Sequence, residues 1–569
     1  MSTFDPAPTR DTTIVGALRA AATGPGRDRT LMTMLNSRGD VVERLTAAQL
    51  DRRVRGVAAR LRAAGVQGDR VLLPAAPGSA FHIGFLACLY AGSIAVPVPE
   101  PRAGSGGDRL RSISRDCGTR VMVRPEAEPD GLAGMLVIPV TADEEEVLAE
   151  PDPLAFDPGG IAMLQYTSGS TGDPRGVVIS HGNLVANQVS LAKRLDVTER
   201  TTVVSWLPLF HDMGLCTGLV LPLVSGAGLV RMEPVTFVRD PLTWLRAISA
   251  REDVFSAAPD FAYNMCVNGI DEATRASLDL SSWRLAANGS EPVQARTLDR
   301  FTEAFAPSGF RPEAFRPGYG MAETTLVVTI APSLTPVVSL RVDRRLLAEG
   351  KVEETDDLDE GLPLVSNGPP TDDAEVRIVD PRTRLELGER TVGEIWVRSP
   401  SNGHGYWQRP DASEETFGAR LAGADDEKGT HVRSGDLGFL SDGELFVTGR
   451  IKDILIIGGI NYYPQDAEAV ATAAHPAFAH QPAAAWPPAE DEPGVTVVLG
   501  TTGQDPEVLR TAVRAAGIAV ARVLPAPVSI LAVPKGEIPR TTSGKVRRRE
   551  CAARARSGTL NVLERWSSR

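Results

Sequence analysis

The sequence predicts an α/β fold. We expect a large N-terminal domain of doubly wound, mixed sheets plus a β subdomain, followed by a small α+β C-terminal domain. The 569 residues are too many for a single hydrophobic core. Helical runs alternate with short apolar runs, as in sheets that carry helices on both faces. A glycine-rich loop follows one of the apolar runs, and ligands of such sheets usually bind where the strands end.

The alternation of helices and strands starts near Ala47 and is interrupted once. The first predicted elements are a helix over 50–64, a strand over 70–73, a helix over 80–91 and a strand over 94–98. After Gly159 the chain continues with a strand over 161–166, a helix after His181, a strand over 203–206, a helix near Leu215 and a strand over 228–231. Since helices separate these strands, we expect the strands to pair in parallel.

The second half of the chain is richer in strands. Apolar runs at 374–379, 393–398 and 444–447 are separated by turn residues, which predicts the β subdomain. From Arg450 onward, helical and apolar runs alternate again on a smaller scale. We therefore predict a first domain over 1–449 and a second over 450–569.

The bulk composition excludes several classes of protein. A net charge of -12 argues against a general nucleic-acid binder, because no positive field would attract phosphate backbones. No signal peptide and no apolar run of about 18 residues is found, so we expect a cytoplasmic protein without a membrane span. The five cysteines and seven histidines are dispersed, which favours reduced thiols and argues against a structural zinc site.

The glycine-rich loop reads Y-T-S-G-S-T-G-D-P-R-G from Tyr166 to Gly176. Its backbone amides can turn inward to hold phosphate oxygens, and its hydroxyls and Arg175 can add contacts. It lacks the G-x-x-x-x-G-K-[ST] pattern of kinases and GTPases. A loop of this composition on its own is more often a plain connection between two elements. Other segments of the chain must therefore decide whether this loop binds phosphate.

Six further motifs follow the loop in order. They are P-L-F-H-D-M-G at 208–214, N-G-S-E-P at 288–292, G-Y-G-M-A-E-T at 318–324, S-G-D-L at 434–437, G-R-I-K-D at 449–453 and P-R-T-T-S-G-K at 539–545. In this order and spacing the motifs resemble those of the adenylate-forming superfamily. The resemblance implies ATP and Mg²⁺ as cofactors, and a mobile C-terminal lid that carries a catalytic lysine.

The same resemblance assigns roles to residues around the phosphates. It implies that Lys545 bridges the attacking carboxylate and the α-phosphate, that His211 lies beside the acyl carboxylate, and that Glu323 holds Mg²⁺ together with Thr171. Lysine is rare, with six among 60 basic residues, and two of the six, Lys452 and Lys545, lie in the motifs. The expected phosphate-binding residues are Thr167, Ser168, Gly169, Ser170, Thr171, Gly172 and Arg175.

The resemblance also implies a nucleoside pocket and a hinge. Tyr319 is expected to stack on adenine, Asp436 to accept the ribose hydroxyls, and Arg450 to cap the ribose or phosphate. Lys452 is the expected hinge of the lid. The other expected pocket residues are Gly289, Ser290, Glu291, Gly320 and Met321.

Within the superfamily the sequence looks closest to the fatty acyl-AMP ligases. The resemblance rests on S-W-L-P-L-F-H-D-M-G-L, N-G-S-E-P-V, N-Y-Y-P-Q-D-A-E from Asn461 and an apparent insertion over 331–365. In that family the insertion is expected to restrain the lid and to disfavour coenzyme A as the acyl acceptor. It implies transfer of a fatty or other apolar acyl group from the adenylate to an acyl carrier protein. Gly458-Gly459 departs from that family's pattern and also resembles acyl-CoA synthetases.

Three alternatives stay open at this point. Coenzyme A could be the acceptor, the protein could be a catalytically inactive AMP-binding module, or Asp260 could anchor the ammonium of an amino-acid substrate. The motif residues Lys545, Glu323 and Asp436 disfavour the inactive module. The apolar segments 215–223 and 255–265 could line an acyl tunnel or could form plain core.

Overall fold

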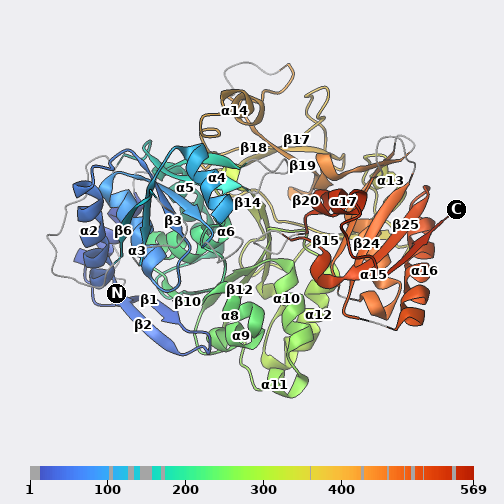
Figure 1. Ribbon diagram of the computed structural model, residues 1–569, viewed down its shortest axis with the longest axis horizontal. Helices are drawn as coiled ribbons and strands as arrows, with labels where there is room; N and C mark the ends of the chain where they lie inside the picture. Colours follow the sequence, from blue (N-terminus) through green and yellow to red (C-terminus); the bar gives the residue numbers. More distant parts are fainter. Residues whose placement is uncertain are drawn as a thin grey trace.

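The computed structural model describes residues 13–100, 107–125, 134–140, 157–167, 174–358, 361–423, 429–457, 460–479, 481–487, 494–503, 505–540 and 546–568. Two large mixed sheets and the helices around them form the body of the molecule. The β subdomain lies beside this body, and the C-terminal elements form a separate unit at one end (Figure 1). The predicted fold class is confirmed.

The first large sheet has eight strands, and it positions most of the site. In spatial order they are β14 (Val327–Ile330), β13 (Phe315–Gly320), β12 (Trp283–Asn288), β11 (Val254–Ala258), β9 (Thr202–Ser205), β10 (Gly228–Arg231), β1 (Thr30–Leu35) and β2 (Val41–Thr46). The strands from β13 to β1 pair in parallel, and antiparallel strands close both edges. The carboxyl ends of β13, β12, β11, β9 and β10 therefore meet along one edge, where ligands of parallel sheets bind.

The second large sheet has six strands and carries the glycine-rich loop. Its order is β6 (Leu136–Pro139), β5 (Val121–Arg124), β3 (Arg70–Pro74), β4 (Ile94–Val98), β7 (Ile161–Thr167) and β8 (Arg175–Ser180). The last two strands form an antiparallel hairpin whose turn is that loop. The helix α5 (His181–Leu195) follows at once, because Ser180 and Asn183 form a reciprocal capping box at its first turn.

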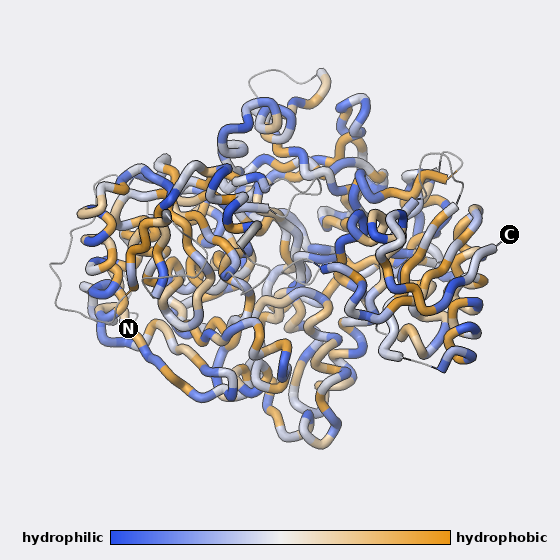
Figure 2. Tube along the Cα trace, in the orientation of Figure 1, coloured by the Kyte–Doolittle hydropathy of each residue, from blue (hydrophilic) through white to orange (hydrophobic). Residues whose placement is uncertain are grey.

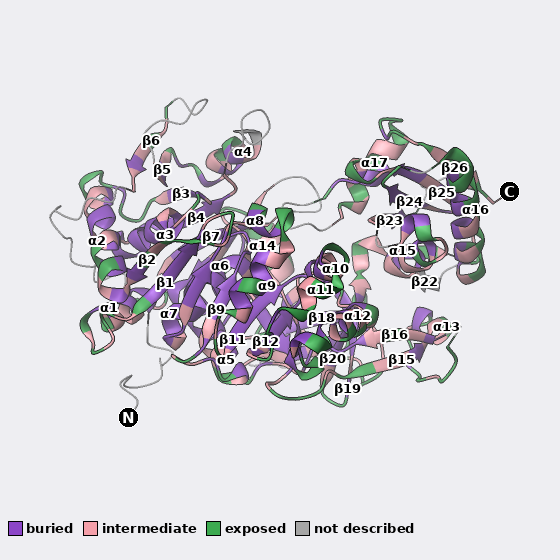
Figure 3. Ribbon diagram, turned by 90° about the horizontal axis from the view of Figure 1, so that it is seen from below, coloured by how far each residue is buried: buried purple, intermediate pink, exposed green. Residues whose placement is uncertain are grey.

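The helices around these sheets are more buried than an ordinary surface helix. The helix α3 (Ala80–Ala91) has buried residues on every side from Phe81 to Ala91, and its sequence contains no charged residue. A helix that is apolar all round must lie inside the protein. The amphipathic helix α2 (Ala47–Ala63) covers it, and of its five arginines Arg52 is exposed and the others are half-buried. Figure 3 shows the resulting buried interior of the body.

The β subdomain and the C-terminal unit each have their own sheet. The subdomain is an antiparallel meander of β17 (Glu375–Val379), β18 (Gly393–Arg398), β19 (Val432–Ser441) and β20 (Glu444–Arg450). The C-terminal sheet contains β23 (Ala483–Trp486), β24 (Val495–Thr501), β25 (Val528–Pro534) and β26 (Glu564–Ser567), with helices α15 (Pro464–Ala473), α16 (Pro506–Val523) and α17 (Arg548–Arg556). The predicted boundary at Arg450 falls at the end of β20.

The C-terminal unit has a compact core of its own. Apolar residues of α15, α16 and the central strands form one buried cluster, and Figure 2 shows apolar segments running along this sheet. Gly517 in α16 lies directly against Trp566, since a Cβ at that position would be 1.9 Å from the indole ring. This glycine therefore lets the helix approach β26 closely.

The expected insertion forms a small substructure that contacts the C-terminal unit. It contains the hairpin strands β15 (Ser339–Asp343) and β16 (Gly361–Val365) and the helix α13 (Arg344–Ala348). Leu347 of α13 belongs to the same buried cluster as Phe439 of the β subdomain and Tyr463 at the start of α15. The insertion thus packs between the β subdomain and the C-terminal unit.

Candidate active site

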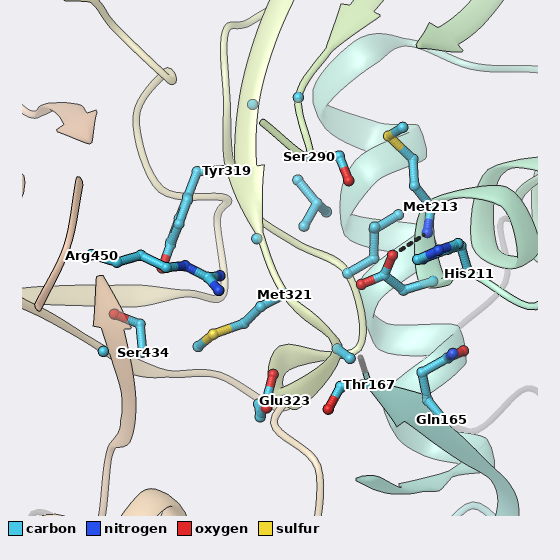
Figure 4. A pocket seen from close by; sticks show the side chains of 18 of the residues that line it. Gln165, Thr167, His211, Met213, Ser290, Tyr319, Met321, Glu323, Ser434 and Arg450 are labelled. Atoms are coloured by element: carbon cyan, nitrogen blue, oxygen red, sulfur yellow. Dashed lines mark hydrogen bonds between the residues drawn. The ribbon is translucent and has the colours of Figure 1, made fainter. Parts of the chain in front are cut away.

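A cavity of about 810 Å³ lies where the body, the β subdomain and the C-terminal unit meet. Figure 4 shows Tyr319 and Arg450 on one side of it and His211 on the opposite side, with Glu323 and Thr167 between them. These residues come from segments far apart in the sequence. The sequence-predicted residues that line this cavity are Thr167, Arg175, His211, Gly289, Ser290, Tyr319, Gly320, Met321, Glu323, Arg450 and Lys452.

The hairpin of β7 and β8 brings the two ends of the glycine-rich loop to the cavity. Thr167 and Arg175 are paired across the hairpin, and both line the cavity at the two ends of the loop. The five residues Ser168, Gly169, Ser170, Thr171 and Gly172 lie outside the described residues. Thr167 and Arg175 thus lie at the cavity, and the contacts of the five residues with phosphate stay predictions.

The turn after β13 needs glycine for steric reasons. A Cβ at Gly320 would lie 1.7 Å from the carbonyl oxygen of Leu326, so no larger residue fits there. Next to it, the hydroxyl of Tyr319 donates to Asp436 at 2.9 Å, and the Nε of Arg450 donates to the other carboxylate oxygen at 2.8 Å. Asp436 is buried behind these two side chains. It can still accept ribose hydroxyls through its remaining lone pairs.

Glu323 reaches the cavity from the short helix that follows this turn. Tyr406 donates a hydrogen bond of 2.8 Å to its Oε1 atom. Burial raises the pKa of Glu323, whereas the bond from Tyr406 and the charge of Arg450 oppose that shift. The carboxylate of Asp212 is also near, and its charge raises the pKa further.

The oxygen donors at this position fit a magnesium ion that is held jointly with a nucleotide. In the part of the chain that the structure describes, no three acidic, histidine or cysteine side chains converge on one point. Mg²⁺ is usually bound by one or two carboxylates together with substrate phosphates rather than by a full protein cage. Glu323, which shares the cavity with Asp212 and Thr167, matches that pattern.

A second cavity of about 310 Å³ adjoins the first and has mostly apolar walls. His211, Met213 and Ser290 line both cavities. The second cavity follows the strand ends from β12 to β10, and its other lining residues are Trp206, Leu207, Pro208, Gly214, Pro234, Val238, Pro259, Phe261, Met265 and Arg540. Its shape and composition suit an apolar chain whose polar end emerges in the larger cavity.

One predicted residue, Glu291, lies away from the nucleoside pocket where the sequence suggested it. The carboxylate of Glu291 accepts a hydrogen bond of 2.6 Å from the backbone amide of Phe261, so it faces the apolar side rather than the nucleoside pocket. Arg540 of the C-terminal unit is close to it. Burial lowers the pKa of Arg540, and the charge of Glu291 opposes that shift.

The two apolar segments expected to line a tunnel do so only in part. Phe261 and Met265 line the second cavity, but between Leu215 and Leu223 only Thr217 reaches a cavity, and it is the polar one. That segment contains a π-helical turn over Cys216–Val220 that is entirely buried. It therefore belongs to the core beneath the site.

Asp260 does not face either cavity. Its carboxylate accepts hydrogen bonds from the Asn288 side chain at 3.1 Å, the Gln294 amide at 3.2 Å and the Thr297 hydroxyl at 2.7 Å. These three donors hold the loop after β12 and use the carboxylate fully. Nothing about this arrangement serves an amino-acid ammonium group.

Several cavity residues were not singled out from the sequence. Tyr406 and Asp212 touch the surroundings of Glu323, and Arg547, Arg548 and Arg549 bring positive charge from the C-terminal unit. Asp212 lies inside a recognised motif, so its neighbour His211 could have drawn attention to it. The contact between Tyr406 and Glu323 joins positions 83 residues apart and leaves no local signal.

Comparison with known proteins finds relatives that match most of the chain. The 4-hydroxyphenylalkanoate adenylyltransferase of Mycobacterium marinum is 39% identical over 549 residues, which cover 92% of this chain and 88% of that protein. The long-chain-fatty-acid–AMP ligase FadD26 of the same species is 38% identical, covering 92% and 93% of the two chains. A solved fatty acyl-adenylate ligase of L. pneumophila, in complex with acyl adenylate and pyrophosphate, is 34% identical with a TM-score of 0.75 and covers 97% of both chains.

The family assignment follows from the match to a family model as well as from these relatives. The model described as AMP-binding enzyme matches residues 18–407, which include the phosphate loop, Glu323 and Tyr406. Among the described residues, no helix is both long and apolar enough to cross a membrane. The chain belongs to the AMP-binding enzyme family of adenylate-forming ligases.

Proposed function

We propose that this protein is a fatty acyl-AMP ligase. It activates a fatty or other apolar carboxylic acid with ATP, releases pyrophosphate, and passes the acyl group to the phosphopantetheine thiol of an acyl carrier protein. The observation that carries the proposal is the junction of the polar and apolar cavities at His211, Met213 and Ser290. The names of the relatives, a fatty-acid–AMP ligase and an adenylyltransferase of aryl-substituted alkanoates, support the acid class.

In the first half-reaction, a carboxylate oxygen attacks the α-phosphorus of ATP and the bond to the β-phosphate breaks. Tyr319 stacks on adenine, and Asp436 accepts the ribose hydroxyls. His211 orients the carboxylate where the two cavities meet. Glu323 and Thr171 would hold Mg²⁺, which would neutralise charge on the phosphates.

Lys545 supplies the cation between the carboxylate and the α-phosphate. It lies in 541–545, outside the described residues, but both flanks of that segment are at the site. Arg540 lines the apolar cavity and Val546 lines the polar one. Preorganised positive charge at a developing negative charge is among the strongest contributions an enzyme can make.

In the second half-reaction, the carrier thiol loses its proton, attacks the acyl carbonyl, and AMP leaves. The exposed residue Lys452, in the short 3₁₀ helix Ile451–Asp453 between β20 and the C-terminal elements, is the proposed hinge for this step. The insertion over 331–365 limits this motion through its contact with Tyr463. Limited rotation favours a carrier protein over free coenzyme A as acceptor.

The test is a product assay with ATP, Mg²⁺ and a fatty acid, analysed by mass spectrometry. We expect acyl-AMP and pyrophosphate without acceptor, and acyl-carrier thioester when an acyl carrier protein is added. If acyl-CoA forms more rapidly when coenzyme A is supplied, the acceptor assignment is wrong. If no acyl-AMP forms with any apolar acid, the protein is not an active ligase.

A further inference from the structure

A loop from the β subdomain contacts Glu323 and its turn at three points. We call residues 399–407 the clamp loop. The Thr325 hydroxyl donates to the carbonyl of Ser401 at 2.7 Å, and the amide of Gly403 donates to the Glu323 carbonyl at 2.8 Å. The third contact is the bond from the Tyr406 hydroxyl to the Glu323 carboxylate. Main chain and side chain of Glu323 are therefore both held by one loop.

The turn that carries Glu323 has an unfavourable backbone conformation. Thr325 has φ 70° and ψ −57°, and the amide of Leu326 donates to the carbonyl of Thr324 at 2.9 Å. This is a γ-turn with a β-branched residue at its centre, a strained arrangement that persists only where neighbouring contacts enforce it. The clamp loop supplies such contacts at Thr325 itself and at Glu323, two residues before it.

The same loop is tied to the phosphate hairpin. Val178 and His404 are linked by one backbone hydrogen bond, Val178 and Gly405 by another, and the amide of Trp407 donates to the Gly176 carbonyl at 2.8 Å. The Arg175 guanidinium lies 5.5 Å from the ring centre of Tyr406, within cation–π distance. One tyrosine thus touches a residue at the end of the phosphate loop and the carboxylate opposite it.

We propose that Tyr406 is a positioning residue that sets the geometry between the magnesium-binding carboxylate and the phosphate loop. The inference rests on the proposed function, because it takes Glu323 as the magnesium ligand. A hydrogen bond to Oε1 fixes the plane of the carboxylate and so the direction of Oε2. The ring of Tyr406 also packs against the Arg175 guanidinium. One side chain therefore fixes the position of Arg175 relative to the Glu323 carboxylate.

A purely structural role for Tyr406 makes a different prediction. The ring is buried and packs edge-to-face on Phe417 at 5.3 Å, so it also fills the core. Tyr406→Phe keeps the ring, its packing and its contact with Arg175, and removes only the hydroxyl. A filler role would leave Mg²⁺ binding unchanged in this variant.

The test measures ATP binding by calorimetry at a series of Mg²⁺ concentrations. For Tyr406→Phe we expect the Mg²⁺ concentration at half-maximal binding to rise about tenfold, as is typical for loss of a hydrogen bond to a charged group. Binding of ATP without Mg²⁺ should not change. Tyr90→Phe is the matched control, because Tyr90 also donates to a carboxylate, that of Asp51, far from the site.

A double-mutant cycle with Glu323→Gln identifies the partner through which Tyr406 acts. We expect Tyr406→Phe to add no further loss of Mg²⁺ binding once Glu323 is replaced. An unchanged Mg²⁺ dependence in Tyr406→Phe, or full additivity in the double variant, overturns the inference. Failure of the wild-type protein to bind ATP with Mg²⁺ would instead contradict the proposed function.

Discussion

The two cavities of this protein share three residues but are built in opposite ways. The polar cavity is assembled from both large sheets, the β subdomain and the C-terminal unit, and its lining includes seven arginines and six acidic residues. The apolar cavity runs along the strand ends of one sheet, and among its lining residues only Arg540 comes from the C-terminal unit. Figure 3 shows the C-terminal unit as a body distinct from the two large sheets and their helices.

This difference indicates how the two half-sites should respond to change. A cavity assembled between domains depends on their relative position, so mutations far from it can alter its geometry. A cavity walled by packed residues of one sheet should be rigid, and Trp206 stacked on Phe237 at 3.9 Å is typical of such a wall. We therefore expect the polar cavity to control rate and the apolar cavity to control the choice of acid.

The largest effect is expected from the C-terminal lysine. Lys545→Ala should lower the rate of acyl-AMP formation by about 10²–10³ for every acid, because one charge-stabilising group is lost from the transition state. Lys535→Ala is the control, since Lys535 is exposed in the same unit. Pyrophosphate exchange would measure both. A near-normal rate in Lys545→Ala would mean that another cation does the work.

The next effect should depend on chain length. Val238 lines the apolar cavity and is 58% exposed, whereas Val235 on the same helix is 55% exposed and does not line it. Val238→Trp should lower kcat/KM about tenfold for acids whose last two methylenes it displaces, at ~0.8 kcal/mol per methylene. Short acids and Val235→Trp should be unaffected. An equal loss of kcat/KM for acids of every chain length would contradict the idea that the apolar cavity controls the choice of acid.

A smaller effect is expected from loosening the insertion. Leu347→Ala removes packing between the insertion and Tyr463 and should increase coenzyme A use by roughly two- to fivefold, the change that about 1 kcal/mol produces. Acyl-AMP formation should persist. Leu385→Ala, at an exposed site of the β subdomain, is the control. Unchanged coenzyme A use in a folded variant would make the insertion an ordinary surface element.

The smallest effect is expected on the pH dependence of stability, through the buried carboxylate of Asp466 in α15. Burial raises the pKa of Asp466 from 3.8 to about 6; the charge of Arg344 opposes the shift and that of Glu468 adds to it. The folded state therefore binds more protons between these values, so this group's contribution favours folding as pH falls from 7 toward 4. Asp466→Asn should raise Tm by roughly a degree or two at pH 7.5 and by less at pH 5. A variant effect that is the same at both pH values would contradict this assignment.

The sequence predicted the elements well because their signals are local. The strand over 94–98 and the helix over 80–91 are found at the predicted residues, and the strand expected over 70–73 extends by one residue. Predicting contacts between distant segments is harder. The segment 215–223 is apolar whether it lines a tunnel or fills a core, and only its position under the site shows that it is core.

Most of the site residues that the motifs indicated line one cavity, whereas the sequence did not predict their geometry. Motifs indicated Glu323, Asp436 and Arg450, since each type of side chain suits its ligand. The sequence does not show that Glu291 turns toward Phe261, because that orientation depends on a backbone amide in another loop. For the same reason the sequence does not identify Tyr406, because it lies 83 residues from Glu323 along the chain and contacts it only in the folded structure.

The most direct measurement is the affinity for a stable acyl-adenylate mimic, an acyl-sulfamoyl adenosine. If the two cavities form one continuous site, both halves of the mimic bind at once, and each buried methylene should add ~0.8 kcal/mol up to the length of the apolar cavity. We predict that a long acyl chain tightens binding at least a hundredfold, at ~1.4 kcal/mol per tenfold, relative to sulfamoyl adenosine without a chain. Equal affinity for the two compounds would show that the cavities are not joined and would contradict the proposed function.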